Sequence, residues 1–272
     1  MTDLPLEVHS AAMYRVHNRL VRSIRCPAGL LLLLLICLPP VSFAATSRWH
    51  DISDYFSQPL HWSGDDWRTA GLLAAGVAGS MVLDHRVRHV FADGGGSAKV
   101  ARFGNGFGSR DGILVEIGWF LTGWLLDDPQ MARTGANMME ADVFSAATTS
   151  VVKVATGRLR PNATSGNGHW LDGGKSFPSG HVTSAFARAT AFAESSAHPA
   201  WWRRGLAYGL AATTVYARLH DNKHWLSDTA AGALVGAGSA LFVVHRHGPD
   251  SIRLSLTDTA GGLGLQLGIP LP

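Results

Sequence analysis

Six apolar stretches of helical length follow one another along this chain, and they constrain its fold more than any other feature. Alanine, glycine, leucine and valine dominate them, and almost no alternating strand pattern lies between them. Such stretches fold as helical bundles, because each helix must bury its apolar side against a neighbour. We therefore predict an all-α bundle of about six helices over residues 45–250. The stretches are Trp67–Leu83, Ile113–Leu126, Met131–Leu159, Gly180–Ser195, Trp202–Ala217 and Trp225–Val244.

Proline and glycine indicate where these helices end and connect. Pro161 cannot continue a helix and disfavours helix at the residue before it, so we expect the third helix to end near Leu159. Residues 91–112 are dense in glycine, but they lack the βαβ context that a phosphate-cradling glycine loop requires. We expect a flexible connection between helices there.

Charged side chains interrupt the apolar stretches. Glu116, Glu140, Asp142 and Arg188 fall inside them, and none of the stretches offers the roughly 20 uninterrupted apolar residues of a membrane-spanning helix. The longest, Thr229–Val244, is short and rich in glycine and alanine. The sequence therefore favours a water-soluble or membrane-surface bundle over an integral membrane protein.

The N-terminal segment has the pattern of an export signal. Within residues 1–44, four arginines precede a short leucine-rich core and small residues, so we expect cleavage after Ala44 or Ala45. An uncleaved membrane anchor is the alternative. Cys26 and Cys37 both lie in this segment, so a processed chain has no disulfide. We expect the protein in the periplasm or at the periplasmic face of a membrane, in the cell envelope.

The C-terminal segment, residues 251–272, alternates apolar and polar positions on both sides of a turn near Thr257–Gly262. This alternation is typical of a β-hairpin. We expect the hairpin to cover an open side of the bundle; an edge strand that docks a partner is the alternative.

The charge balance does not indicate a nucleic-acid partner, and we expect none. The formal net charge is +3, and two of these units belong to residues 1–44, so the rest of the chain is near neutral. Proteins that bind nucleic acid carry a basic patch instead.

Three separated clusters between Lys153 and Asp228 carry the chemistry. In the first, Lys153 and Arg160 are seven residues apart, so on one helix their side chains leave the same face two turns apart. Two fixed cations directed at one place describe an anion site; a solvated helix end is the alternative. Arg158 is expected to point elsewhere, toward solvent or a headgroup.

The second cluster, Pro178–His181, opens a helix with Ser179 at the capping position and Gly180 leaving the backbone bare. Free N–H groups, a hydroxyl and the positive end of the helix dipole then converge, which suits phosphate oxygens. His181 lies in the first turn of that helix, where a capping or packing role is the alternative.

In the third cluster, His224 and Asp228 are four residues apart and share a helix face. The carboxylate can accept from one imidazole nitrogen and leave the other free to attack. Arg218 lies six residues upstream, so we expect a break at residues 220–222 that turns it toward the same site. Metal ligation is the alternative for His224 and Asp228, but three neighbouring cations would repel a divalent ion.

Together these residues suit in-line phosphoryl transfer to a histidine. The cations neutralise the equatorial oxygens, one histidine attacks and the other donates a proton.

The same residues resemble the signature of the type 2 phosphatidic acid phosphatase and vanadium haloperoxidase superfamily. That signature is a lysine, six residues and Arg-Pro, then Pro-Ser-Gly-His, then Ser-Arg, five residues, His, three residues and Asp. Over residues 153–228 the chain matches every spacing and departs at one position, where Ala217 stands in place of the serine. The missing hydroxyl removes a hydrogen bond near Arg218 and puts efficiency in doubt more than identity.

The resemblance implies a role for each matching residue. His224 is the nucleophile that forms a phosphohistidine, Asp228 orients it, and His181 is the general acid. The phosphate would be bound by Lys153, Arg160, Ser179, Gly180 and Arg218. No metal and no other cofactor is implied.

The leading hypothesis is a metal-independent phosphatase that acts on a phosphate monoester or pyrophosphate, of a lipid, in the cell envelope. A soluble periplasmic acid phosphatase is the alternative, and a vanadate-dependent haloperoxidase is a more distant one. The family, the export signal and several tryptophans that suit a membrane interface favour a phosphorylated lipid and a membrane surface as partners. The same tryptophans are equally compatible with a core. They are Trp119, Trp124, Trp201 and Trp202.

Overall fold

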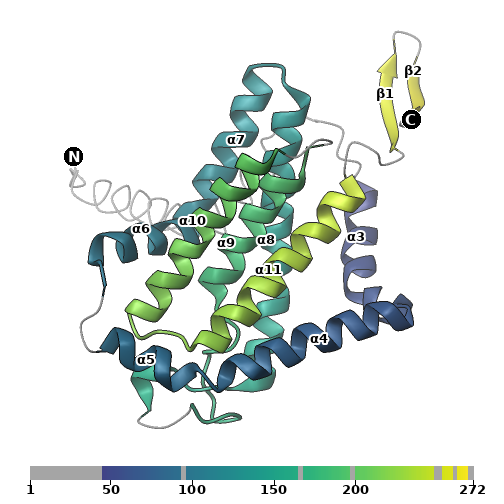
Figure 1. Ribbon diagram of the computed structural model, residues 1–272. Helices are drawn as coiled ribbons and strands as arrows, with labels where there is room; N and C mark the ends of the chain where they lie inside the picture. The colour runs from purple at the N-terminus through teal and green to yellow at the C-terminus, as the bar shows by residue number, and fades with distance from the viewer. Residues whose placement is uncertain are drawn as a thin grey trace, which may run out of the picture. The chain divides into compact units, whose positions relative to one another are not determined.

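The computed structural model describes residues 45–92, 96–164, 168–196, 200–247, 253–259 and 262–268. Figure 1 shows that the described residues up to 247 form helices, and that the connection from α8 to α9 is much longer than most of the others. The α-helices are α3 (Ala45–Ser57), α4 (Gly64–Met81), α5 (Asp84–Ala92), α6 (Ala98–Gly108), α7 (Ile113–Leu125), α8 (Pro129–Thr156), α9 (Gly180–Glu194), α10 (Trp201–His220) and α11 (Leu226–His247). Short 3₁₀ turns are η1 (Gln58–His61), η2 (Arg110–Gly112) and η3 (Pro161–Ala163). The prediction of an all-α fold is confirmed for this part of the chain; the predicted helix number was too low, because α3, α5 and α6 were not expected.

The glycine-rich segment is helical, so the prediction of a flexible connection at residues 91–112 is wrong for α6. Its glycines let α6 lie against α10 at a very short distance. A Cβ on Gly104 would stand 2.0 Å from the backbone oxygen of Thr213, and one on Gly108 would stand 2.3 Å from the Thr214 side chain. The glycines therefore serve helix packing, which outweighs their low helix propensity.

Helix α8 ends three residues earlier than we predicted. Gly157 caps it in the left-handed conformation, with φ of 52°, and its N–H bonds to the backbone oxygen of Lys153. Arg160 consequently lies beyond the helix. The prediction that Lys153 and Arg160 share one helix face is therefore wrong, because glycine and not Pro161 ends the helix.

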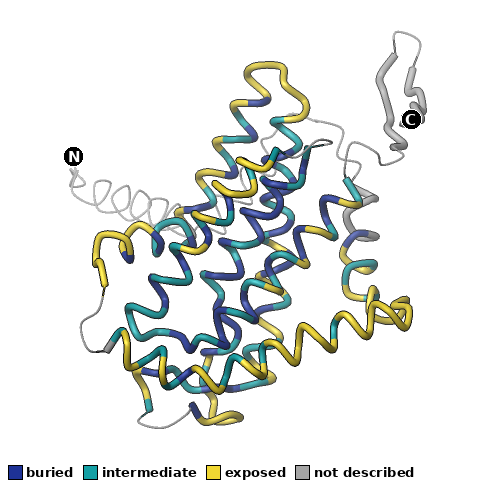
Figure 2. Tube along the Cα trace, in the orientation of Figure 1, coloured by how far each residue is buried: buried dark blue, intermediate teal, exposed yellow. Residues whose placement is uncertain are grey.

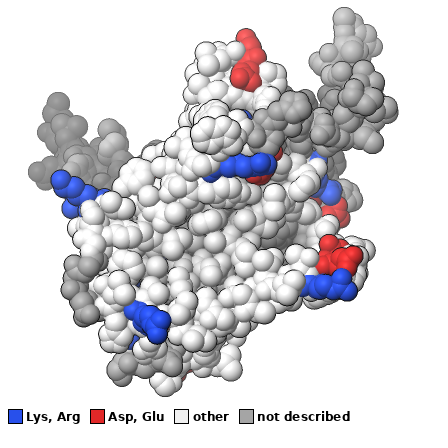
Figure 3. Space-filling model, in the orientation of Figure 1, with Lys and Arg blue, Asp and Glu red and all other residues white. Residues whose placement is uncertain are grey.

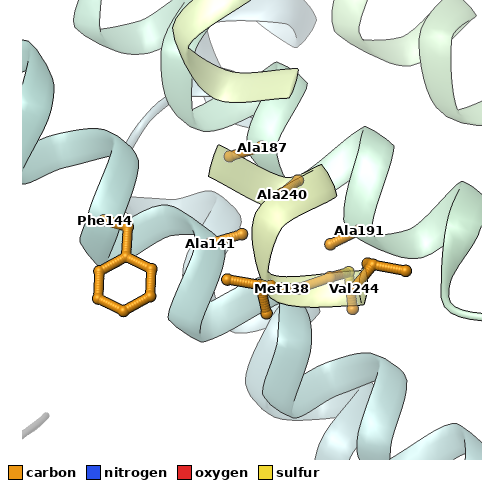
Figure 4. Close-up of a cluster of buried hydrophobic side chains, with 8 residues drawn as sticks. Met138, Ala141, Phe144, Ala187, Ala191, Ala240 and Val244 are labelled. Carbon is orange, nitrogen blue, oxygen red and sulfur yellow. The ribbon is translucent and has the colours of Figure 1, made fainter. Parts of the chain in front are cut away.

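Helix α9 is the centre of the bundle and packs against α8, α10 and α11. One core cluster joins α8, α9 and α11, with Phe144 and Met138 as its largest members (Figure 4). A second cluster joins α9 and α10 through alanines. The first cluster contains Met138, Ala141, Phe144, Ala187, Ala191, Ala240, Val243 and Val244, and the second contains Ala185, Ala189, Ala193, Ala207 and Ala211.

Helices α9 and α11 approach most closely at two glycines. A Cβ on Gly232 would stand 2.7 Å from the backbone oxygen of Ser179, and one on Gly236 would stand 2.2 Å from that of Thr183. This close contact brings the start of α9 beside the first turns of α11, where the candidate site lies.

Helix α4 differs from the core helices α9 and α11, since none of its residues is buried (Figure 2). It begins with a capping box at Ser63 and Asp66, and it exposes Trp67, Leu72 and Leu73. An apolar helix with so little burial gains little stability from the bundle it lies on.

Helix α11 is long and apolar enough to cross a membrane, and it is the one such helix among the described residues. It runs to His247 rather than ending at Val244, so our expectation that no stretch reaches this length does not hold for α11. Buried core helices share these features, and 56% of its most apolar window is buried inside the protein.

Beyond the helices, strands β1 (Arg253–Thr259) and β2 (Gly262–Gly268) pair in a two-stranded sheet. A hairpin that covers the bundle, and a domain boundary near residue 250, remain predictions. The predicted export signal, residues 1–44, with Cys26 and Cys37, lies outside the described residues.

Candidate active site

The site forms where the end of α8, the start of α9 and the connection from α10 to α11 meet. His224 lies in the connection two residues before α11, and Asp228 lies in the first turn of α11, so the prediction that the two share a helix face is wrong. Ser179, Gly180 and His181 lie at the start of α9, beside them. The backbone N–H of Ser179 donates to the backbone oxygen of Asp228 at 2.9 Å, which joins the two helix starts directly.

His224 is buried and lies beside a carboxylate. Its Nδ1 stands 3.4 Å from Oδ2 of Asp228, and its side chain is 2% exposed. Burial lowers the pKa of His224 to about 4, although Asp228 acts to raise it. The imidazole is therefore neutral at pH 7, with Nδ1 on the carboxylate side and Nε2 available for attack.

Asp228 is held as a carboxylate by several donors. It accepts from Arg158 at 2.7 Å, from the Ser176 hydroxyl at 2.5 Å and from the Trp225 backbone N–H at 2.9 Å. Burial would raise the pKa of Asp228, but its contacts with His224, Arg158 and Ser176 keep that pKa below its ordinary value. A carboxylate so fixed can hold the ring of His224 in one orientation.

Arg158 joins Asp228 to a second carboxylate, Asp84. It donates to Asp84 at 2.7 Å, and Asp84 also accepts from the backbone N–H and the hydroxyl of Ser227 at 2.8 and 2.7 Å. Arg158 is 1% exposed and lies over the ring of Trp170. The prediction that Arg158 faces solvent or a headgroup is wrong, because the cap at Gly157 turns the chain inward.

Ser179 is the N-cap residue of α9 by position, but its side chain makes no capping bond. Its hydroxyl is fully buried and has no hydrogen-bond partner within the described residues. Buried polar atoms nearly always have a partner, so this oxygen is a candidate contact for a bound ligand. The free N–H groups at the start of α9 face the same place.

Gly180 has room for a side chain in the protein alone. A Cβ there would stand 3.8 Å from Lys153 Cε and Thr149 Cγ2, which is ordinary contact. Packing within the protein therefore does not require glycine at this position. A ligand that approaches the backbone closely would require it.

Lys153 reaches from α8 to the backbone that precedes α9. Its Nζ donates to the backbone oxygens of Lys175, at 3.0 Å, and Pro178. Burial lowers the pKa of Lys153 to about 8; Asp228 acts to raise it, and Arg160 and Arg218 act to lower it. The mutual influence of these groups shows that the cations are gathered in one place.

Arg218 enters the site from the end of α10. Helix α10 ends at His220, and Asn222 has a positive φ of 53°, so the predicted break at residues 220–222 is confirmed. The Arg218 guanidinium donates to Asn105 of α6 at 2.7 Å, and Asn105 donates in turn to Asp221 at 2.7 Å. Burial lowers the pKa of Arg218 from its ordinary value.

The cations of the site all act on the pKa of His181. Burial lowers its pKa to about 4, and Arg218, His224, Arg160 and Lys153 act in the same direction. In the free protein His181 is thus neutral at pH 7, and the expectation that it is protonated there needs correction. A bound phosphate brings negative charge among these cations and would raise the pKa of His181 again.

Four residues with close contacts to the predicted site were missed from the sequence. Asp84 and Asn105 lie far from the motif along the chain, and only tertiary packing brings them close. Ser176 lies in a polar loop with no pattern of its own. For Arg158 a signal was available, since Gly157 is the residue type that ends helices in the left-handed conformation.

Known proteins resemble the chain in the region of this site. Residues 136–250 match the model of the PAP2 superfamily. A segment of 84 residues, 31% of this chain, is 39% identical to a lipid A 1-phosphatase of Porphyromonas gingivalis and covers 17% of that protein. The chain thus matches less than a fifth of that relative's length. The crystal structure of LpxE from Aquifex aeolicus gives a TM-score of 0.44 at 16% identity, over 60% of this chain and 95% of that chain.

Proposed function

We propose that the chain, whose residues 136–250 match the model of the PAP2 superfamily, is a phosphoric ester hydrolase of that superfamily with His224 as its nucleophile. The substrate we propose is a phosphorylated lipid, a monoester or pyrophosphate, in the cell envelope. No metal takes part in the proposed chemistry.

The observation that carries the proposal is the buried Ser179 hydroxyl without a partner, at the start of α9. Lys153 lies beside Gly180 at the same helix start, and the charges of Lys153, Arg160 and Arg218 act on one another and on His181. A phosphate group would supply both the missing hydrogen-bond acceptor and the missing negative charge.

The reaction follows from the placement of the two histidines. Nε2 of His224 attacks phosphorus and the bond to the ester oxygen breaks, while the cations and the α9 N–H groups stabilise the equatorial oxygens. His181 gives its proton to the leaving oxygen. Water then attacks the phosphohistidine, His181 accepts the proton of that water, and phosphate leaves with His224 neutral again.

Exposed apolar side chains support a lipid substrate. Among the described residues on the face in Figure 3, charged side chains leave a broad uncharged area in the middle. Trp124, Trp201 and Trp202 are exposed, whereas Trp119 packs against the core. Large exposed apolar areas mark membrane or partner surfaces in soluble proteins, and tryptophan favours the membrane interface. The name of the lipid A 1-phosphatase relative agrees with this substrate class.

The first experiment is phosphate release by the purified chain. We expect turnover of a phosphorylated lipid in detergent to exceed turnover of a soluble aryl phosphate, to survive chelators and to be inhibited by vanadate. The His224→Ala variant should have no activity on either substrate. Equal or faster turnover of the aryl phosphate would favour the soluble acid phosphatase, and full activity of His224→Ala would refute the proposed nucleophile.

Glycine substitutions provide a matched control. Gly180→Ala should leave stability unchanged, since the new methyl group finds ordinary contacts, but should weaken phosphate binding and activity. Gly236→Ala should instead destabilise the fold, because its methyl group would stand 2.2 Å from the Thr183 oxygen. Activity of Gly180→Ala equal to that of the parent would count against phosphate binding at the start of α9.

A further inference from the structure

Three helices bring Asp51, Glu140 and His247 together at the end of α11 away from the candidate active site. Asp51 lies on α3, Glu140 on α8 and His247 at the end of α11. One ligand atom from each residue lies within 4.8 Å of the other two. We propose that these three side chains bind a divalent transition-metal ion of the zinc class.

The distances favour an ion over direct hydrogen bonds. Nε2 of His247 is 3.5 Å from Asp51 Oδ2 and 3.4 Å from Glu140 Oε1. Charge-assisted hydrogen bonds are shorter, at about 2.7–2.9 Å. Ligands of a tetrahedral zinc ion, with bonds of about 2.0–2.1 Å, stand roughly 3.3–3.5 Å apart. The two separations from Nε2 of His247 fall in the range that such an ion imposes.

The charges around the three residues also call for a divalent cation. Asp51 is 2% exposed, and Arg246 pairs with both Asp51 and Asp54. Together with Glu140 these carboxylates carry two more negative charges than Arg246 neutralises. A protonated His247 supplies one positive charge, whereas a divalent ion bound to a neutral His247 supplies two. Arg246 engages the other oxygen of Asp51, Oδ1, and leaves Oδ2 on the His247 side.

The position indicates a structural role. His247 is 19 residues after Asp228 on α11, so the two lie about 28 Å apart along the helix axis. In Figure 1, α3 stands beside the end of α11. Tyr55 already ties α3 to the bundle through Thr148 and Ser239. The metal would tie the preceding turn of α3 to α8 and α11.

The test uses the full chain, freed of any affinity tag and stripped with a chelator, and zinc as the probe. Calorimetric titration should give one zinc ion per chain, and cobalt should give the visible spectrum of a tetrahedral site. His247→Ala should weaken zinc binding by more than about 100-fold, since loss of an outer partner alone costs about 10- to 100-fold. The matched control is His245→Ala, because His245 is exposed on the same helix and bonds to the Leu241 backbone oxygen.

Thermal unfolding supplies a second readout. Zinc should raise the melting temperature of the parent and of His245→Ala, and should not raise that of His247→Ala or Glu140→Gln. If His247→Ala fails to fold, Glu140→Gln decides. Absence of stoichiometric zinc binding by the parent, or equal binding by the two histidine variants, would overturn the proposal. Phosphate release in chelator is scored separately, so a failure of this site and a failure of the phosphatase are distinguishable.

Discussion

Arg158 and Arg188 are both buried between two carboxylates, but the two networks hold their carboxylates differently. Arg158 pairs with Asp84 and Asp228, and both carboxylates accept further hydrogen bonds. Arg188 pairs with Glu116 at 2.7 Å and stands 3.6 Å from Asp142. One buried oxygen of Glu116 and one of Asp142 have no hydrogen-bond partner within the described residues.

The difference appears in the charge states. Donors around Asp228 keep its pKa below the ordinary value, whereas burial raises the pKa of Glu116 to about 7 despite Arg188. The number of donors therefore decides whether a buried carboxylate stays ionised. We infer that the Arg158 network serves the histidine and that the Arg188 network serves the packing of α7, α8 and α9.

The largest expected effect comes from the same substitution in each network. Asp228→Asn should lower the turnover number by about 10³- to 10⁴-fold, because an amide no longer fixes the tautomer and charge of His224. Asp142→Asn should leave turnover unchanged. Phosphate release at saturating substrate measures both, and a comparable loss in the two variants would erase the distinction between the networks.

Removal of the arginines should destabilise both networks. Arg158→Met leaves two buried carboxylates without their cation, and Arg188→Met leaves buried Glu116 and partly buried Asp142 without theirs. Each should cost about 3–5 kcal/mol in the free energy of unfolding. Denaturant unfolding followed by circular dichroism measures this cost. The folded fraction of Arg188→Met should retain normal turnover, and that of Arg158→Met should not. If Arg188→Met folds but has no activity, the Arg188 network, which we call the core network, would belong to the active site after all.

The difference in the pH dependence of stability between the parent and Glu116→Gln should report the core network. Because the folded protein raises the pKa of Glu116 from 4.5 to about 7, the contribution of this group is fully present below about pH 4.5 and is lost as the pH rises through about 7. Glu116→Gln should remove this loss, on the order of 3 kcal/mol. Melting temperatures between pH 5 and 8 test it.

Glu194→Gln is the control for that measurement. Glu194 pairs with Arg204 near the surface, and this contact lowers its pKa, so its contribution is lost only in acid. Its curve should run parallel to that of the parent between pH 5 and 8. Parallel curves for Glu116→Gln as well would contradict the raised pKa of Glu116.

The pH dependence of the rate should report the protonation of groups in the candidate active site. This is the smallest of the expected effects. Above pH 7 the ratio kcat/KM should fall further as Lys153 loses its proton near pH 8, since a neutral lysine no longer attracts phosphate. The fall amounts to roughly tenfold by pH 9. Lys153→Arg should abolish this basic limb, whatever its absolute rate, because arginine stays charged. If the fall of kcat/KM at high pH is unchanged in Lys153→Arg, a group other than Lys153 causes it.

Apolar stretches predicted most of the helices, and short-range spacing predicted that Pro178–His181 opens a helix and that His224 lies beside Asp228. These residues are at most four apart, so local geometry is enough to bring them together. Contacts between distant segments were not predictable. Asp84 meets Ser227 across 143 residues and Asn105 meets Arg218 across 113, and neither pairing leaves a local pattern.

Local rules also failed where two of them competed. In α6 the close packing on α10 prevailed over the low helix propensity of glycine, so a segment with the composition of a loop became a helix. At the end of α8 the cap at Gly157 acted before Pro161 could. Both errors concern glycine, whose effect depends on what lies next to it in the folded protein.

The two glycines between α9 and α11 have a consequence for how such a protein can diversify. With Gly232 and Gly236 against the α9 backbone, the distance between the start of α9 and the start of α11 has little room to change. Selection for a new substrate would leave this distance fixed and would have to act on the surrounding segments, such as the helices α4 to α6. Reactivity and selectivity would then evolve in separate parts of the same chain.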